Sequence, residues 1–157
     1  MRHWTRVKDW LPALAWAGLI CSLSTDAFSS NHTSVVIVPV LRWLFSHAST
    51  ETIEWMHEII RKMAHLTEYF ILGVLLHRAL RGDDRGWKLK WAFWAIVIAA
   101  AYASLDEFHQ SFVPGRGPAV ADVLLDTAGG VAAQLVAALF MLWGDVRARQ
   151  REKASGA

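Results

Sequence analysis

Charged and amide side chains gather in one stretch of this chain, 101–126, which otherwise joins two apolar segments. The polar residues of this stretch are Asp106, Glu107, His109, Gln110, Arg116, Asp122 and Asp126. An Asp or Arg at the centre of a membrane-spanning helix costs about 2.5–3.5 kcal/mol on insertion scales. Because such residues are expensive to keep beside apolar helices, we expect this stretch to form part of a functional site.

A second polar group lies at the start of another apolar segment and consists of Lys62, His65 and Glu68. Across the two groups, three pairs have helical spacing: His65 with Glu68, Asp106 with His109, and Asp122 with Asp126. Side chains three or four residues apart share a face of a helix. Each pair is therefore expected to point in one direction, and Asp126 is expected to point into a helix bundle rather than toward lipid.

These residue types could support metal binding or acid–base chemistry. Imidazole and carboxylate groups are ligands for hard or borderline metal ions. The residues that could form such a site are His65, Glu68, Asp106, His109 and Asp122. A histidine could also act as a general base beside a carboxylic acid. Neither Ser104 nor Ser111 has a nucleophile motif around it, so the main expectation is a site without a metal or cofactor.

The sequence PGRGP at 114–118 predicts a tight turn between the two apolar segments. Proline fixes φ and glycine permits unusual backbone angles. Such a turn would hold the Arg116 guanidinium in place, where it could neutralise nearby carboxylates or bind a phosphate or carboxylate. Pro118 also suits the first position of a following helix. The alternative is that Arg116 only links the loop to the bundle.

The elements that must position these residues are apolar helices. Hydrophobic residues make up 54% of the chain, which includes nine Trp in 157 residues, and this composition favours an all-α polytopic membrane protein. The expected spans in a single domain, 1–157, are about 10–25, 63–80, 91–108 and 119–143, followed by a basic tail at 144–157. The first span could instead be a signal peptide, but no clear cleavage site follows it.

The connection between the first two spans contains a shorter apolar piece, 35–45, that includes Pro39 and Arg42. Its length is insufficient to cross a bilayer, so we expect an interfacial or re-entrant segment. Ser49 and Thr50 are typical caps at the start of a helix. His57 and His77 are expected to be structural, and Cys21 is expected to be a small buried side chain.

Basic residues predict the orientation of the four spans. Twelve of the 16 Lys and Arg residues lie on the side of the termini and of the loop between the second and third spans. The positive-inside rule therefore places both termini in the cytoplasm and the polar groups on the extracytoplasmic side. Small residues at 95, 99 and 103 and at 129, 133 and 137 predict close packing of the third and fourth spans against each other.

Two motifs resemble those of the VanZ-like integral membrane proteins. KMAHLTEY at 62–69 is similar to the first motif, and YASLDEFHQSFVPGR at 102–116, followed by Asp122, Asp126 and Gly129, is similar to the second. The resemblance covers about 62–136. The characteristic residues that it implies are Lys62, His65, Glu68, Tyr69, Asp106, Glu107, Gln110, Arg116, Asp122 and Asp126. The family pattern often has Asn at position 126, so Asp126 adds a charge here.

The resemblance implies a bacterial cytoplasmic-membrane protein of the cell envelope, and its founding member lowers susceptibility to teicoplanin. The favoured hypothesis is a protein whose outer polar cluster binds an envelope lipid, a cell-wall precursor or a lipoglycopeptide. The alternatives are a membrane-embedded hydrolase or transferase acting on a lipid-linked substrate and a structural or interaction module. Nothing beyond the basic tail suggests a nucleic-acid partner, and the sequence does not indicate an oligomeric state.

Overall fold

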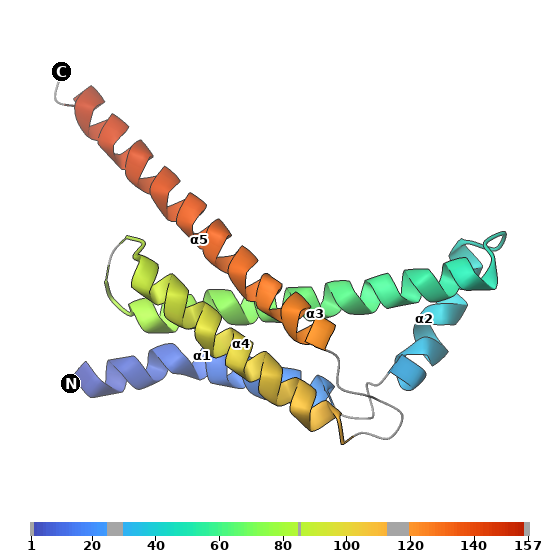
Figure 1. Cartoon of the computed structure of the whole chain (residues 1–157). Helices are drawn as coiled ribbons and strands as arrows, with labels where there is room; N and C mark the ends of the chain where they lie inside the picture. The colour runs from blue at the N-terminus through green and yellow to red at the C-terminus, as the bar shows by residue number, and fades with distance from the viewer. Residues whose placement is uncertain (1, 25–29, 85, 113–119, 156–157) are drawn as a thin grey trace.

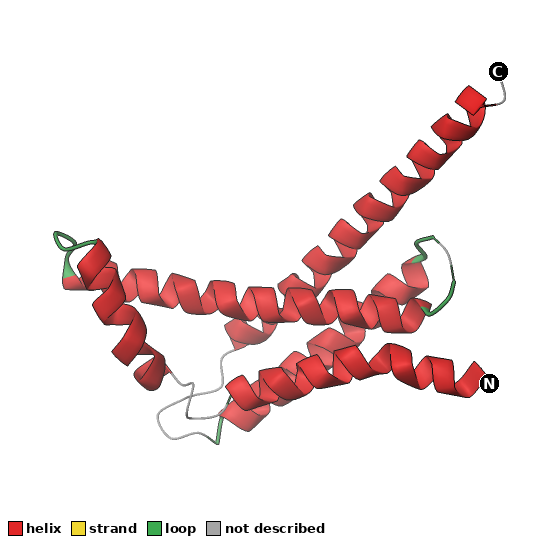
Figure 2. Cartoon of the chain, turned by 180° about the vertical axis from the view of Figure 1, so that it is seen from behind, coloured by secondary structure: helices red, strands yellow, loops and turns green. Residues whose placement is uncertain are grey.

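The computed structural model describes residues 2–24, 30–84, 86–112 and 120–155, and these residues form helices and short turns without strands. The helices are α1 (Arg2–Leu23), α2 (Ser30–Leu44), α3 (Thr50–Arg81), α4 (Leu89–Gln110) and α5 (Val120–Ser155) (Figures 1 and 2). The all-helical prediction is confirmed for these parts of the chain. Two helices, α4 and the 120–148 part of α5, are long and apolar enough to cross a membrane. The count of four spans stays a prediction.

Helix α3 is central to the packing, because it contacts α1, α2, α4 and α5. Ser49 caps its first turn, because the Ser49 hydroxyl accepts a hydrogen bond of 3.2 Å from the Thr52 amide. The predicted helix start is therefore confirmed, and the same helix runs on through the expected span at 63–80, whose bounds in a membrane stay a prediction. The 32-residue helix continues without a break to Arg81. It ends at Gly82, whose φ of 55° lies in the left-handed region that favours glycine.

The piece expected at 35–45 belongs to the 15-residue helix α2, which includes Pro39. Proline lacks an amide donor, but the helix continues through it and Pro39 is exposed. Helix α2 packs against α3, near the start of α3 (Figure 1). Its placement at a membrane interface stays a prediction.

Glycine allows α3 and α5 to approach closely. A Cβ on Gly129 would lie 2.5 Å from the carbonyl oxygen of Leu66, and a Cβ on Gly73 would lie 2.9 Å from the Cβ of Ala133. Both distances are shorter than a side chain tolerates, so only hydrogen at these positions fits the observed contact. The α3–α5 contact is therefore made by backbone against backbone.

The predicted pairing of the small-residue stripes is only partly correct. Ala95, Ala99 and Ala103 of α4 are fully buried. The glycine that faces them is Gly130, whose added Cβ would lie 3.2 Å from that of Ala99, while Gly129 faces α3. Neighbouring residues in a helix point about 100° apart at 3.6 residues per turn, so an added Cβ would meet α3 at Gly129 but α4 at Gly130, while the Gly130 backbone also lies against Gly73 of α3. Helix α5 thus packs on α3 and α4 at the same level.

Polar contacts also link the helices. The Trp16 indole nitrogen donates to the carbonyl of Glu68 at 2.9 Å, and the Tyr102 hydroxyl donates to the carbonyl of Ala17 at 2.6 Å. The buried His77 Nδ1 pairs with Gln134 Oε1 at 2.7 Å between α3 and α5, as expected for a structural histidine. Cys21 is exposed among the described residues, so its expected burial is wrong.

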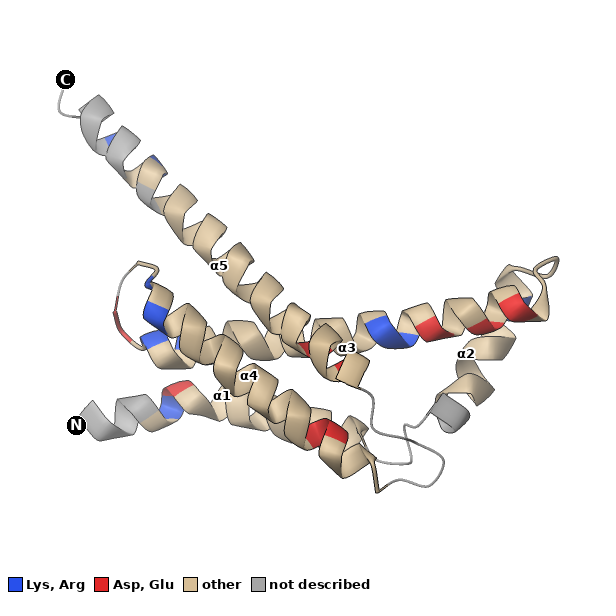
Figure 3. Ribbon diagram, in the orientation of Figure 1, with Lys and Arg blue, Asp and Glu red and all other residues tan. Residues whose placement is uncertain are grey.

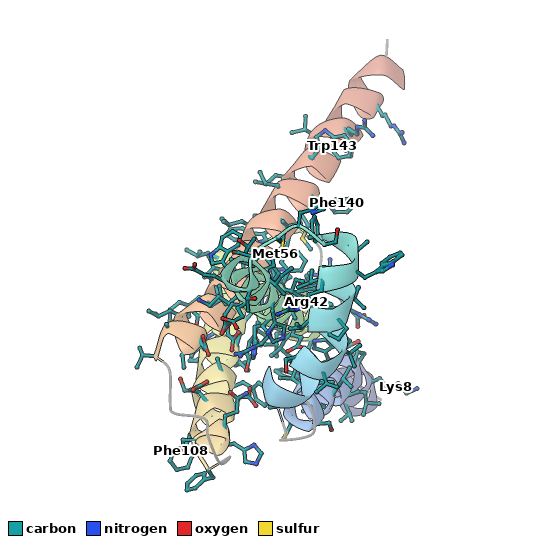
Figure 4. All side chains as sticks on the ribbon, turned by 90° about the vertical axis from the view of Figure 1, so that its right-hand side faces the viewer. Lys8, Arg42, Met56, Phe108, Phe140 and Trp143 are labelled. Atoms are coloured by element: carbon teal, nitrogen blue, oxygen red, sulfur yellow. The ribbon has the colours of Figure 1, made fainter. Side chains whose placement is uncertain are left out.

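The outside of the molecule is strongly apolar. Large side chains such as Phe108, Phe140 and Trp143 are 64%, 72% and 53% exposed and project away from the other helices (Figure 4). The C-terminal half of α5 extends beyond the rest of the bundle (Figures 1 and 2). An apolar exterior of this kind is unusual for a monomer in water and suits a membrane.

Basic side chains are concentrated on one side of the molecule, together with a few acidic ones in α1 and the α3–α4 turn (Figure 3). The start of α1, the α3–α4 turn and the end of α5 lie on one side of the molecule, where most of the coloured basic residues of these segments are found (Figure 3). The acidic residues at the end of α4 lie on the opposite side (Figure 3). This arrangement agrees with alternating helix directions, and the orientation in a membrane stays a prediction.

We predict that Gly129→Ala lowers the stability of the purified protein in detergent. The added methyl group would collide with the Leu66 carbonyl, and overpacking of this kind costs about 1–3 kcal/mol. The matched control is Gly144→Ala, also in α5, where nothing lies within 4 Å of the added Cβ. Thermal unfolding followed by circular dichroism should show a lower midpoint for Gly129→Ala only. Equal midpoints for the two variants would contradict the observed helix contact.

Candidate functional site

Polar side chains from three helices meet where α3, α4 and α5 pack together. We call this group the polar cluster, and it consists of His65, Glu68, Tyr69, Asp106, Gln110 and Asp126. Tyr69, Gln110, Asp126 and Asp106 are almost completely buried, with exposures of 0%, 1%, 4% and 6%. His65 and Glu68 are half-buried. The sequence analysis named all six residues, and the structure brings them together.

Asp106 is held by two hydrogen bonds. The hydroxyl of Ser24, at the end of α1, donates to Asp106 Oδ2 at 2.8 Å, and Gln110 Nε2 donates to the same oxygen at 2.8 Å. A buried carboxylate needs such donors because leaving water is costly for a charged group. The Ser24 contact therefore joins the end of α1 to the polar cluster.

His65 and Asp126 connect α3 to α5. The His65 Nδ1 lies 3.5 Å from Asp126 Oδ1, and the contact is an ion pair when His65 is protonated. The closest backbone approach of the two helices, between Leu66 and Gly129, lies beside this pair. Leu66 directly follows His65, and Gly129 lies about one helical turn after Asp126. The glycine contact thus brings the two side chains within reach of each other.

Glu68 places a further carboxyl group beside this pair. It is close enough to interact electrostatically with His65, Asp126 and Asp106.

Two buried polar atoms of the cluster have no hydrogen-bond partner among the described residues. They are the hydroxyl oxygen of Tyr69 and the Oε1 of Gln110. The Tyr69 ring packs against Tyr102, with ring centroids 6.2 Å apart. Buried polar atoms are nearly always satisfied, and an unsatisfied one costs about 1–3 kcal/mol. A polar ligand or ordered water is the usual partner of such atoms.

A cavity opens beside the polar cluster, with a volume of about 170 Å³. The polar residues that line it are Ser24, Thr33, Arg61, His65, Glu68 and Gln110. Its walls come from α1, α2, α3 and α4, so the cavity depends on the whole arrangement of these helices. It has room for several water molecules or a small polar group.

Sequence reasoning missed Ser24 and Arg61 as site residues. Arg61 lines the cavity, and its Nη1 lies 3.5 Å from Oε1 of Glu58. It precedes His65 by four residues, so its place on the same face of α3 was a usable signal. Ser24 reaches the cluster through the packing of α1, and no pattern in the sequence indicates that.

Other predicted site residues lie apart from the cavity. Lys62 and His109 are exposed, Asp122 is half-buried, and Glu107 is buried without lining the cavity. The expectation that Asp106 and His109 share a face is wrong, because Asp106 is buried with Gln110, four residues on, instead. Arg116 and the turn at 114–118 lie outside the described residues.

The alternative metal site is not assembled in the structure. Within residues 2–24, 30–84, 86–112 and 120–155, no three His, Cys, Asp or Glu side chains are arranged to hold a metal ion. His65 and Glu68 lie at the cavity, whereas His109 is exposed to the outside of α4. The set of five ligands named from the sequence therefore does not form a single site in these parts of the chain.

We predict that Ser24→Ala lowers the stability of the folded protein. It removes a hydrogen bond to the buried Asp106 carboxylate, a type of bond that contributes about 1.5–3 kcal/mol. Ser104→Ala is the control, since the exposed Ser104 hydroxyl bonds only to the Ala100 carbonyl of its own helix. Thermal unfolding in detergent should separate the two variants. Unchanged stability of Ser24→Ala would mean that the α1 contact is dispensable.

Comparison with known proteins agrees with the two motifs. Residues 10–141 match the family described as VanZ/LLP1, and this range contains every member of the polar cluster. No curated protein and no solved structure matches the chain. Because the family match covers more than half of the sequence, the chain belongs to the VanZ/LLP1 family.

Proposed function

We propose that this VanZ-family protein binds the polar headgroup of an envelope lipid, a lipid-linked cell-wall precursor or a lipoglycopeptide in the cavity beside the polar cluster. The observation that supports this proposal is the cavity itself, which His65, Glu68 and the buried Gln110 line together. Sites of this kind have few, well-placed polar groups in largely apolar surroundings.

The chemistry of the cavity suits a headgroup with groups of both charges or with many hydroxyls. Arg61 and a protonated His65 can bind a phosphate or carboxylate. The half-buried Glu68 carboxylate can accept hydrogen bonds from an ammonium, an amide or a sugar hydroxyl. The three proposed kinds of ligand share this chemistry, and each also has an apolar part.

The proposal includes a location and an orientation. The chain would cross the bacterial cytoplasmic membrane with α1, α3, α4 and α5, leaving both termini in the cytoplasm and the cavity toward the extracytoplasmic side. The support is the distribution of basic residues along the sequence and the apolar exterior of the helices. Envelope precursors and glycopeptides are accessible from the outer side, so the cavity would face its ligand.

We predict that Glu68→Gln weakens headgroup binding about 10- to 100-fold. This loss corresponds to one hydrogen bond to a charged group at about 1.4 kcal/mol per tenfold. The control is Glu54→Gln, which changes an exposed carboxylate of the same helix outside the cavity. The measurement is the amount of each envelope lipid that co-purifies with wild type and variants in mild detergent, quantified by mass spectrometry.

Thermal unfolding of the same samples distinguishes binding from a structural role. Loss of lipid by Glu68→Gln at unchanged stability supports a binding site. A loss that follows reduced stability supports the structural-module hypothesis instead, and equal lipid content in all three proteins contradicts the proposal.

Resistance to glycopeptides is tested separately through Arg116, whose role stays a prediction from the sequence. In a sensitive host at matched membrane levels, we expect wild type but not Arg116→Ala to lower susceptibility to teicoplanin more than to vancomycin. Only teicoplanin has an acyl chain, so a site near the membrane surface would discriminate between the two compounds. If neither protein changes susceptibility, this member has no resistance role and the ligand lies among the envelope lipids.

A further inference from the structure

A second, apolar groove lies between α1 and α3 next to the cavity. It has a volume of about 430 Å³, and its walls include Trp16, Leu19, Ile20, Met63 and Ile71. The groove and the cavity share four lining residues: Leu23, Ile60, Ala64 and Glu68. The two spaces therefore lie side by side on the same stretch of α3, and the polar side chains Arg61, His65 and Gln110 line only the cavity.

The groove offers almost no free polar group to an occupant. The Trp16 indole nitrogen is already bonded to the Glu68 carbonyl at 2.9 Å. The Thr67 hydroxyl is bonded to the Met63 carbonyl of its own helix at 2.7 Å. Glu68 is the exception, and it stands at the boundary that both spaces share. A hydrocarbon chain suits the groove and a polar group suits the cavity beyond Glu68.

We infer that one acyl-chain lipid occupies both spaces, with its headgroup in the cavity and a chain in the α1–α3 groove. This inference rests on the proposed function and narrows it, because the ligand class becomes a lipid recognised at both ends rather than a soluble headgroup. The cavity and the groove have four lining residues in common, so a molecule bound in the cavity also contacts the wall of the groove. Charge complementarity adds to it: Arg61 and His65 suit a phosphate, and Glu68 suits an ammonium.

Ala64 is the best position at which to block the junction between the cavity and the groove. It lines both of them, and its small side chain is exposed on α3. A phenylalanine at this position would fill the junction without replacing any buried side chain. Ala101 is a matched control, because it is an exposed alanine of α4 that lines neither space.

The test uses the full-length protein in phosphatidylcholine vesicles that contain a minor fraction of phosphatidylethanolamine with a photoreactive diazirine in one acyl chain. After illumination, mass spectrometry maps the cross-linked peptides. We expect enrichment at α1 and α3 residues of the groove over the exposed apolar surface of α5 at 135–143. Ala64→Phe and Glu68→Gln should each reduce groove cross-linking to the level of that surface, whereas Ala101→Phe should leave it unchanged.

Three results would overturn the inference. The first is groove cross-linking no higher than at α5, and the second is cross-linking unaffected by Ala64→Phe and Glu68→Gln, which would identify ordinary bilayer contact. The third is equally tight binding of water-soluble glycerophosphoethanolamine. The lipid co-purification described above remains a separate readout, so the headgroup site can stand when the groove fails. If Glu68→Gln leaves both readouts unchanged, the proposed function fails as well.

Discussion

The backbone contact between α3 and α5 is the constraint on which the site depends. Gly129 and Gly73 let the two helices approach until no side chain fits between them. At this separation His65 and Asp126 come within 3.5 Å, while Gly130 on the adjacent face of α5 meets the alanine stripe of α4. A larger residue at either glycine would separate the helices that supply the polar cluster. In this fold the smallest residues therefore determine where the charged ones lie.

Each buried aspartate of the polar cluster has a polar partner close by. Asp106 receives two hydrogen bonds, and Asp126 faces an imidazole. These contacts offset the cost of burying carboxylates among apolar helices. The Tyr69 hydroxyl and Gln110 Oε1 differ, because no described residue satisfies them. Since most of the cluster is paired and these atoms are not, binding of a polar molecule is a natural explanation for them.

Much of this arrangement could be predicted from the sequence. The long apolar segments indicated four of the helices, and the two motifs indicated six residues that do meet. Helical spacing alone failed for His109, because i,i+3 and i,i+4 neighbours diverge in direction and Gln110 turned out to share the buried face with Asp106. Ser24 and Arg61 were missed as site residues, since their roles arise from packing between helices. The sequence indicated a helix start at Ser49 and a span at 63–80 separately, because polar residues lie between them, and the structure joins both in one helix.

The length of α3 has a consequence for the membrane around the proposed site. Its 32 residues extend about 48 Å, whereas the hydrocarbon core of a bilayer is about 30 Å thick. With Arg81 at the cytoplasmic boundary, the core would end near residue 61, and His65 would lie only about 6 Å below the outer boundary. The first turns of α3, with α2 packed on them, would then stand among the headgroups. A membrane helix tilts when its hydrophobic stretch is longer than the bilayer core is thick. In this placement a thinner bilayer would tilt α3 and change the depth of the cavity opening.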